Sequence, residues 1–154
     1  DHGDFYFESY MIQDEDLQEG DLRLLTVDNP LVIPANKDIQ ILITAGDVLH
    51  SWAVPSMGLK TDAVPGRLNE TWVNVKEPGT YRGQCSEICG TGHGFMPVVV
   101  KVLPENEFMA WVNEAKNNYA INEDIQPITS SETEEELVLS KNDVLKLEFE
   151  ENKL

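Results

Sequence analysis

The sequence has no apolar run approaching the roughly 18 residues that a membrane-spanning helix requires. Its amino terminus, DHGDFYFESY, also lacks the basic and then apolar pattern of a secretory signal. No transmembrane segment is therefore predicted within these 154 residues.

Basic residues are scarce, with 11 lysines and arginines against 28 aspartates and glutamates, which gives a formal net charge of -17 at pH 7. Such a charge repels nucleic-acid phosphate and anionic lipid headgroups. Nucleic acid is therefore not expected as a partner, and a basic protein is the natural electrostatic complement. The alternative is that the acids only solvate the surface.

A length of 154 residues with 41% hydrophobic content suits one compact domain. Short apolar segments separated by Asn, Asp, Gly and Pro clusters are typical of a β-sandwich. The expected strands lie at 22–27, 38–44, 70–75 and 96–102. Pro104 then suits the start of a helix, because apolar residues follow it at helical spacing: Phe108, Trp111, Val112 and Ala115. The predicted fold class is all-β with one carboxyl-terminal α-helix that covers the sandwich.

The domain is expected to span residues 1–118, because the composition changes beyond it. Residues 121–154 hold ten acids against three bases and include the run ETEEEL. Residues 119–154 are therefore predicted to form an acidic extension that is either disordered or docked on a neighbouring subunit.

Cysteine and histidine are also scarce, yet both cysteines and one of the three histidines fall within GQCSEICGTGHGFMPVVV. Cys85 and Cys89 could form a disulfide, which is one interpretation. However, His93 and Met96 follow closely, and thiolate, imidazole and thioether together favour copper. A single blue-copper ion uses one cysteine, whereas two thiolates can bridge a pair of copper ions. Two coppers then need two histidines.

The second histidine is expected to be His50, in DVLHSWAVPS at the end of a strand, 35 residues before Cys85. A lone histidine there is usually structural, but an upstream strand and a downstream loop share the ligands in cupredoxins. His2 lies near an unanchored terminus, and no role is assigned to it.

Two segments, VLHSWAVPSMGLKTDAVPGRLN and YRGQCSEICGTGHGFMPVVV, resemble the dinuclear copper A domain of cytochrome c oxidase subunit II. The resemblance covers residues 5 to 116, and C-x-E-x-C-x-x-x-H-x-x-M is its most specific part. It implies a cupredoxin-like Greek-key β-sandwich or barrel.

The same resemblance implies a ligand set. Cys85 and Cys89 would bridge the two coppers, and His50 and His93 would bind one copper each. Met96 and the backbone carbonyl of Glu87 would be weak axial ligands. An apolar shell would exclude solvent, although core packing explains its members equally well: Trp52, Phe95 and Pro97.

The resemblance also implies contacts with the catalytic subunit I. The side chain of Glu87 would bind a magnesium ion shared with that subunit, since Mg²⁺ prefers carboxylate and water oxygens. Lys60, Asp62 and Arg67 would face the same interface, although an ordinary cluster of surface charges is the alternative.

The implied function is electron transfer within an oxygen-reducing, proton-translocating oxidase. Reduced cytochrome c would dock near Glu8, Asp28 and Asp47 and pass one electron at a time to the copper, which relays it to haem in subunit I. The expected location is the intermembrane-space side of the mitochondrial inner membrane, with a bacterial periplasmic face as the alternative. Other interpretations are a mononuclear copper carrier, a copper chaperone and a structural disulfide domain. A nitrous oxide reductase also has a dinuclear copper loop, but it should bring a large propeller domain, for which these 154 residues have no room.

In the family this domain follows two transmembrane helices and an aromatic segment, which these 154 residues do not contain. The resemblance therefore suggests either a trimmed fragment or one half of a subunit encoded in two pieces. We expect the second, with a membrane-anchored amino-terminal half of subunit II as a partner.

Overall fold

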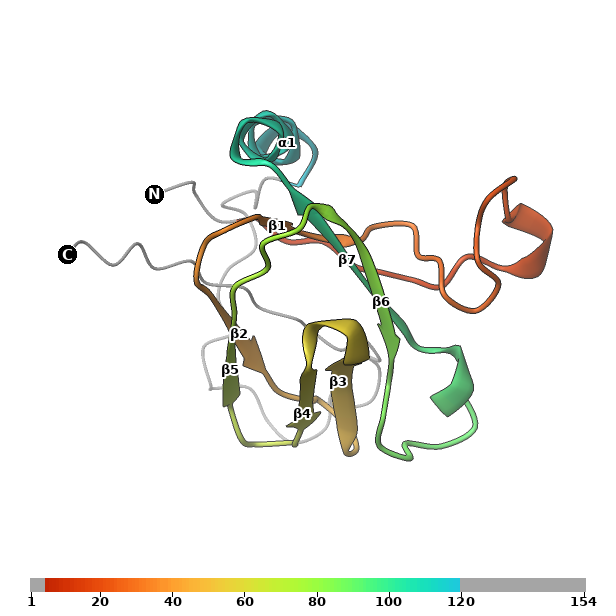
Figure 1. Cartoon of the computed structure of the whole chain (residues 1–154). Coiled ribbons are helices and arrows are strands. Elements are labelled where there is room, and N and C mark those ends of the chain that lie inside the picture. The colour runs from red at the N-terminus through yellow and green to blue at the C-terminus, as the bar shows by residue number, and fades with distance from the viewer. Residues whose placement is uncertain (1–4, 120–154) are drawn as a thin grey trace.

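A computed structural model describes residues 5–119 of the chain. Within this part, seven strands and one α-helix follow one another along the sequence (Figure 1). The strands are β1 (Leu31–Pro34), β2 (Ile39–Ile43), β3 (His50–Val54), β4 (Leu59–Ala63), β5 (Asn69–Val73), β6 (Gly79–Gln84) and β7 (Pro97–Leu103). The helix is α1 (Glu105–Asn118), and three short 3-10 turns are η1 (Asp14–Asp16), η2 (Pro55–Met57) and η3 (His93–Phe95).

The strands pair in three groups. β7 lies between β1, to which it is parallel, and β6, to which it is antiparallel. β2 pairs antiparallel with β5, and β3 pairs antiparallel with β4. In Figure 1 the β2–β5 and β3–β4 pairs lie across from the long β6 and β7 strands, and α1 lies at the far end of β7. The predicted all-β class with one carboxyl-terminal helix is confirmed.

The core lies between these groups and consists of aliphatic side chains that leave water almost completely. It includes Ile33, Ile41, Ile43, Val54, Val100 and Val102. Burial of such side chains contributes about 1.5–3 kcal/mol each relative to leaving them exposed. This packing holds β3 and β6, the two strands that lead into the candidate site, at a fixed separation.

Three of the four expected strands are confirmed, as β2, β5 and β7. The fourth, at 22–27, is wrong, because Leu24 has a φ of 64° and the backbone turns there. The N–H of Leu25 donates to the carbonyl of Leu22, and the Thr26 hydroxyl exchanges hydrogen bonds with the Leu22 backbone. Apolar residues alone did not distinguish this closed turn from a strand.

The predicted helix is confirmed, and its buried face is Phe108, Val112 and Ala115. It begins at Glu105, with Pro104 as the residue before its first turn. The ring of Phe5 meets the edge of Trp111 with 5.5 Å between centroids, so the amino-terminal segment packs on the helix.

The predicted acidic extension lies outside the described residues, apart from Tyr119, whose hydroxyl donates to Asn29 Oδ1 over 2.9 Å. Within residues 5–119, no helix has the length and apolar character that crossing a bilayer demands.

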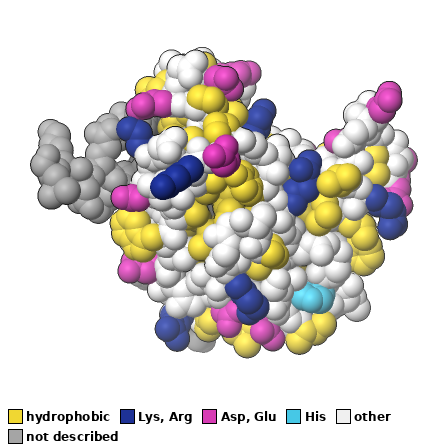
Figure 2. Space-filling view, viewed as in Figure 1, with side chains coloured by type: hydrophobic (Ala, Val, Ile, Leu, Met, Phe, Trp, Pro, Cys, Tyr) yellow, Lys and Arg dark blue, Asp and Glu magenta, His cyan; other side chains and the backbone are white. Residues whose placement is uncertain are grey.

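Figure 2 shows one face of the molecule, on which acidic side chains are scattered and a histidine reaches the surface beside hydrophobic side chains.

Candidate metal centre

The loop between β6 and β7 carries five of the six expected ligand residues, all except His50. Cys85 directly follows β6, and its N–H donates to the carbonyl of Met96 over 2.9 Å, which closes the base of the loop. Inside it, the N–H of His93 donates to Gly90 over 3.2 Å, as part of the turn η3. The loop therefore folds back on itself, and residues eleven apart in sequence become neighbours.

His50 reaches this loop because β3 and β6 cross closely. It is the first residue of β3, and not at the end of a strand as expected. At the crossing, a Cβ atom on Gly83 would lie only 1.7 Å from the carbonyl oxygen of Ala53. Beyond it, the N–H of Ser86 donates to the carbonyl of Ser51 over 3.0 Å. These contacts bring the start of β3 beside the end of β6.

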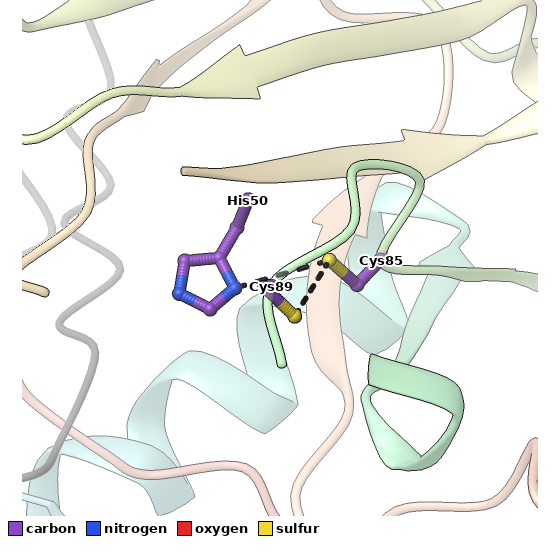
Figure 3. A group of neighbouring side chains, drawn as sticks. All are labelled: His50, Cys85 and Cys89. Carbon is purple, nitrogen blue, oxygen red and sulfur yellow. Dashed lines mark hydrogen bonds between the residues drawn. The ribbon is translucent and has the colours of Figure 1, made fainter. Parts of the chain in front are cut away.

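The two thiols lie at the centre of the site, with 3.8 Å between Cys85 Sγ and Cys89 Sγ. His50 Nδ1 is 3.9 Å from Cys85 Sγ, and the Cys85 thiol donates to the carbonyl of Glu87 over 3.3 Å. The ligand atoms of His50, Cys85 and Cys89 all lie within 4.8 Å of one another (Figure 3). These three residues form a candidate metal site.

Cys89 has a matching set of neighbours. His93 Nδ1 and Met96 Sδ each lie 3.5 Å from Cys89 Sγ. Each thiol is thus accompanied by one imidazole nitrogen and one weaker donor, a carbonyl for Cys85 and a thioether for Cys89. The donor atoms fall into two similar sets that share the sulfur pair.

Both cysteines are free thiols, so the disulfide interpretation does not describe this structure. Burial raises the pKa of the Cys85 thiol, but hydrogen bonds with the backbone of Glu87 and Ser51 and with His50 and His93 outweigh it. The pKa falls from 9.0 to about 7. A thiol with a lowered pKa supplies more of the thiolate that binds metals.

The imidazole of His50 is buried and held from its other side. Its Nε2 lies 2.8 Å from Asp47 Oδ1, while its Nδ1 faces the sulfur of Cys85. The hydrogen bond with His50 is the main cause that lowers the pKa of the Asp47 carboxyl. The sequence suggested Asp47 only as a docking acid, and the DVLH spacing is the signal that could have indicated this contact.

The other two expected docking acids, Glu8 and Asp28, both accept hydrogen bonds from Tyr10. The hydroxyl of Tyr10 donates to Glu8 Oε2 over 2.7 Å, and its backbone N–H donates to Asp28 Oδ1 over 2.7 Å. Tyr6 also donates to Glu8, over 3.1 Å. Tyr10 therefore joins two acids that are 20 residues apart in sequence.

The residues expected at the subunit interface are all exposed. Lys60 and Asp62 form an ion pair at 3.1 Å on β4, and Arg67 follows in the turn toward β5. Glu87 is half-buried in the metal-site loop. Of the expected apolar shell, Trp52 is buried and Pro97 half-buried, but Phe95 is 55% exposed and does not enclose the site in this structure.

The family model "Cytochrome C oxidase subunit II, periplasmic domain" matches residues 1–103. A probable cytochrome c oxidase subunit 2 of Rickettsia felis is 54% identical over 122 residues, which are 79% of this chain and 38% of the relative. Cytochrome c oxidase subunit 2 of Phytophthora megasperma is 54% identical over 111 residues, which are 72% of this chain and 42% of the relative. The chain thus spans less than half the length of these relatives.

Two solved structures are also similar. The periplasmic domain of subunit II of cytochrome oxidase (CoxB) of Bradyrhizobium japonicum has a TM-score of 0.71 and 48% identity, covering 78% of this chain and 83% of that one. A mixed disulfide intermediate between thioredoxin-like TlpA and subunit II of cytochrome c oxidase (CoxB) has a TM-score of 0.66 and 45% identity, covering 77% of this chain and 80% of that one. The chain belongs to the family of cytochrome c oxidase subunit II periplasmic domains.

Proposed function

We propose that this chain holds a dinuclear copper centre. The observation that carries the proposal is the division of the donors into two sets around a thiol pair, with 3.8 Å between the sulfurs. His50 and the Glu87 carbonyl accompany Cys85, whereas His93 and Met96 accompany Cys89. Sulfur and imidazole ligands suit copper, so the donor set fits two such ions.

Two coppers held by Cys85, Cys89, His50 and His93 would supply one-electron redox chemistry at this site. The chain's own residues would keep the ligands from moving as the charge changes. The hydrogen bond from Cys85 to the Met96 carbonyl and that from Ser86 to the Ser51 carbonyl fix the ends of both ligand segments. Buried Trp52 would help to exclude solvent from one side.

The chain would accept electrons one at a time from reduced cytochrome c and pass them to haem in the catalytic subunit I, where oxygen is reduced and protons are translocated. The net charge of -17 supports a basic partner. Glu8, Asp28 and Asp47 remain the proposed docking acids. Asp28 and Asp47 are exposed, and Glu8 is partly exposed.

The proposed interface with the catalytic subunit contains two parts. The half-buried Glu87 side chain would bind a magnesium ion shared between the subunits, since Mg²⁺ prefers carboxylate oxygens. The contact of Glu87 with Cys85 uses the backbone carbonyl, so the carboxylate is left for this role. The exposed Lys60, Asp62 and Arg67 would contact the same subunit. The complex would lie in the mitochondrial inner membrane with this domain on the intermembrane-space side, or in a bacterial membrane with the domain on the periplasmic face.

The alternative functions need fewer donors than the loop provides. A mononuclear copper carrier would use one cysteine and leave the Cys85–Glu87 or the Cys89–Met96 set without a metal. A copper chaperone has no need of the second histidine and the thioether. The paired arrangement of six donors therefore supports the dinuclear centre over both.

A specific observation also favours a thioredoxin-like partner during assembly. Cys85 Sγ and Cys89 Sγ are 3.8 Å apart, so an external two-electron oxidant, such as an oxidising protein disulfide, would join them in a disulfide after small movements. A relative of this chain was solved as a mixed disulfide with a thioredoxin-like protein. We propose that a thioredoxin-like dithiol reduces this disulfide by exchange and is itself oxidised, which restores both thiols for copper.

The test of the copper proposal is reconstitution of the full chain with copper under reducing conditions. We expect about two coppers per chain by metal analysis. We also expect electron paramagnetic resonance of the oxidised form to show the hyperfine pattern of one electron shared by two copper nuclei. One copper per chain with the pattern of a single nucleus would support the mononuclear alternative instead.

A further inference from the structure

The buried imidazole of His50 has a carboxylate partner that none of the proposed roles explains. We propose that Asp47 is a positioning residue of the metal centre, which turns Nδ1 of His50 toward Cys85 by accepting a hydrogen bond from Nε2. Asp47 thereby belongs to the centre itself and not only to the docking face. The inference rests on the proposed copper function for the ligand role of His50.

The argument begins with the single proton of a neutral imidazole. A carboxylate can only accept hydrogen bonds, so the 2.8 Å contact between Asp47 Oδ1 and His50 Nε2 places the ring proton on Nε2. Nδ1 then carries the lone pair that a metal needs. Nδ1 is also the nitrogen that lies 3.9 Å from Cys85 Sγ, and Figure 3 shows the ring with this nitrogen toward the thiols.

Burial makes this orientation matter. The side chain of His50 is 11% exposed, whereas that of Asp47 is 64% exposed. Water therefore has little access to the imidazole. Asp47 supplies the hydrogen-bond acceptor that water would supply to an exposed histidine. Hydrogen-bond partners of this kind fix the tautomer and the orientation of metal-binding histidines in other proteins.

Asp28 offers a matched control, because it is an exposed acid of the same type with other partners. Its Oδ1 accepts hydrogen bonds from the backbone N–H groups of Tyr10 and Asn29. Asp28→Asn and Asp47→Asn remove the same charge from the proposed docking face. Of the two, only the change at Asp47 alters a side chain that hydrogen-bonds with the imidazole of His50.

The first experiment uses the full chain without copper, so it does not depend on the proposed function. Nitrogen NMR at alkaline pH reports which ring nitrogen of His50 carries the proton. We expect the Nε2–H tautomer in the unchanged chain and in Asp28→Asn, a mixture in Asp47→Ala, and recovery in Asp47→Asn, whose amide oxygen still accepts. An unchanged Nε2–H tautomer in Asp47→Ala would overturn the inference.

The second experiment measures copper affinity of the same variants by competition with a chelator. We expect Asp47→Ala to bind copper roughly 10- to 100-fold more weakly, with an altered copper spectrum, and Asp47→Asn to retain most of the affinity. Asp28→Asn should bind copper as tightly as the unchanged chain and give the same copper spectrum. If Asp47→Ala kept its copper affinity and spectrum and only reacted more slowly with cytochrome c, Asp47 would be a docking acid alone. If neither the unchanged chain nor any variant bound copper, the proposed function would fail. The NMR result on the copper-free chain would still decide the positioning role of Asp47.

Discussion

At the scale of single residues, the site depends on which atom of each side chain faces the sulfur pair. His50 and His93 both present Nδ1, at 3.9 Å and 3.5 Å from their cysteines. Glu87 participates through its backbone oxygen, which leaves its carboxylate available for a second role. Substitutions at these positions therefore separate the role of a side chain from that of the backbone.

Cys89→Ser tests whether the centre holds two copper ions that share one unpaired electron. The change removes the sulfur that lies within 3.5 Å of both His93 and Met96, so one donor set loses its thiolate. We expect the copper content to fall to one ion or fewer per chain and the shared-electron hyperfine pattern to disappear. Ser86→Ala is the control, because Ser86 is exposed in the same loop and its hydroxyl contacts only the Gln84 carbonyl among the described residues. An unchanged spectrum in Cys89→Ser would refute the assignment.

Glu87→Gln tests the proposed magnesium ligand. The backbone carbonyl at 3.3 Å from Cys85 Sγ is retained, so the copper spectrum should stay the same. The neutral amide binds a hard cation less well than a carboxylate, so the divalent site in the assembled oxidase should weaken. Bound manganese, substituted for magnesium, provides the readout. Loss of the copper centre in this variant would show that the carboxylate supports the copper and not the magnesium.

At the scale of elements, the crossing of β3 and β6 decides whether His50 and Cys85 meet. Gly83 allows the crossing, because the Ala53 carbonyl occupies the space that a side chain would need. Two residues after Gly83 and directly after the end of β6, Cys85 begins the metal-site loop. The geometry of the site therefore depends on a glycine that binds nothing.

Gly83→Ala is expected to destabilise the fold and displace Cys85 from His50. A Cβ at 1.7 Å from a backbone oxygen forces β6 away from β3, and overpacking of this kind costs at least about 1–3 kcal/mol. Chemical denaturation of the copper-free chain measures the loss. Gly92→Ala is the control, since a Cβ there meets nothing within 4 Å and its φ is -82°. Equal stability of the two variants would mean that the strands do not need this close approach.

The sequence predicted some elements and missed others for identifiable reasons. β2, β5 and β7 are rich in Ile and Val or alternate cleanly, so their patterns indicated strands. β4 (LKTDA) and β6 (GTYRGQ) are polar or glycine-containing, and their pairing depends on neighbours far away in the sequence. The loop ligands were found because they are close in sequence, whereas His50, 35 residues upstream, was expected because cupredoxins take one ligand from an upstream strand. Gly83 was missed, because a crossing between strands leaves no local pattern.

At the scale of the whole molecule, the charge is unbalanced but the acids are not equivalent. Asp47 is linked to the candidate metal site through His50, whereas Glu8 and Asp28 are held together by Tyr10. The net charge of -17 would attract a basic partner. The ionic strength of the solution should then control how often the partners meet.

We expect the copper-loaded chain to react with reduced cytochrome c at a rate that falls steeply as salt is added. Attraction between exposed charges is screened beyond a Debye length of about 8 Å at physiological ionic strength, so the long-range part of the encounter is lost first. Stopped-flow absorbance at low cytochrome concentration measures this rate. Asp28→Asn should react more slowly at low salt and converge with the unchanged chain at high salt, because the variant lacks one of the screened charges. Reduction by a small uncharged reductant is the control and should not depend on salt in either chain. A cytochrome c reaction that is equally independent of salt would exclude electrostatic docking and leave the acidic surface with a role in solvation alone.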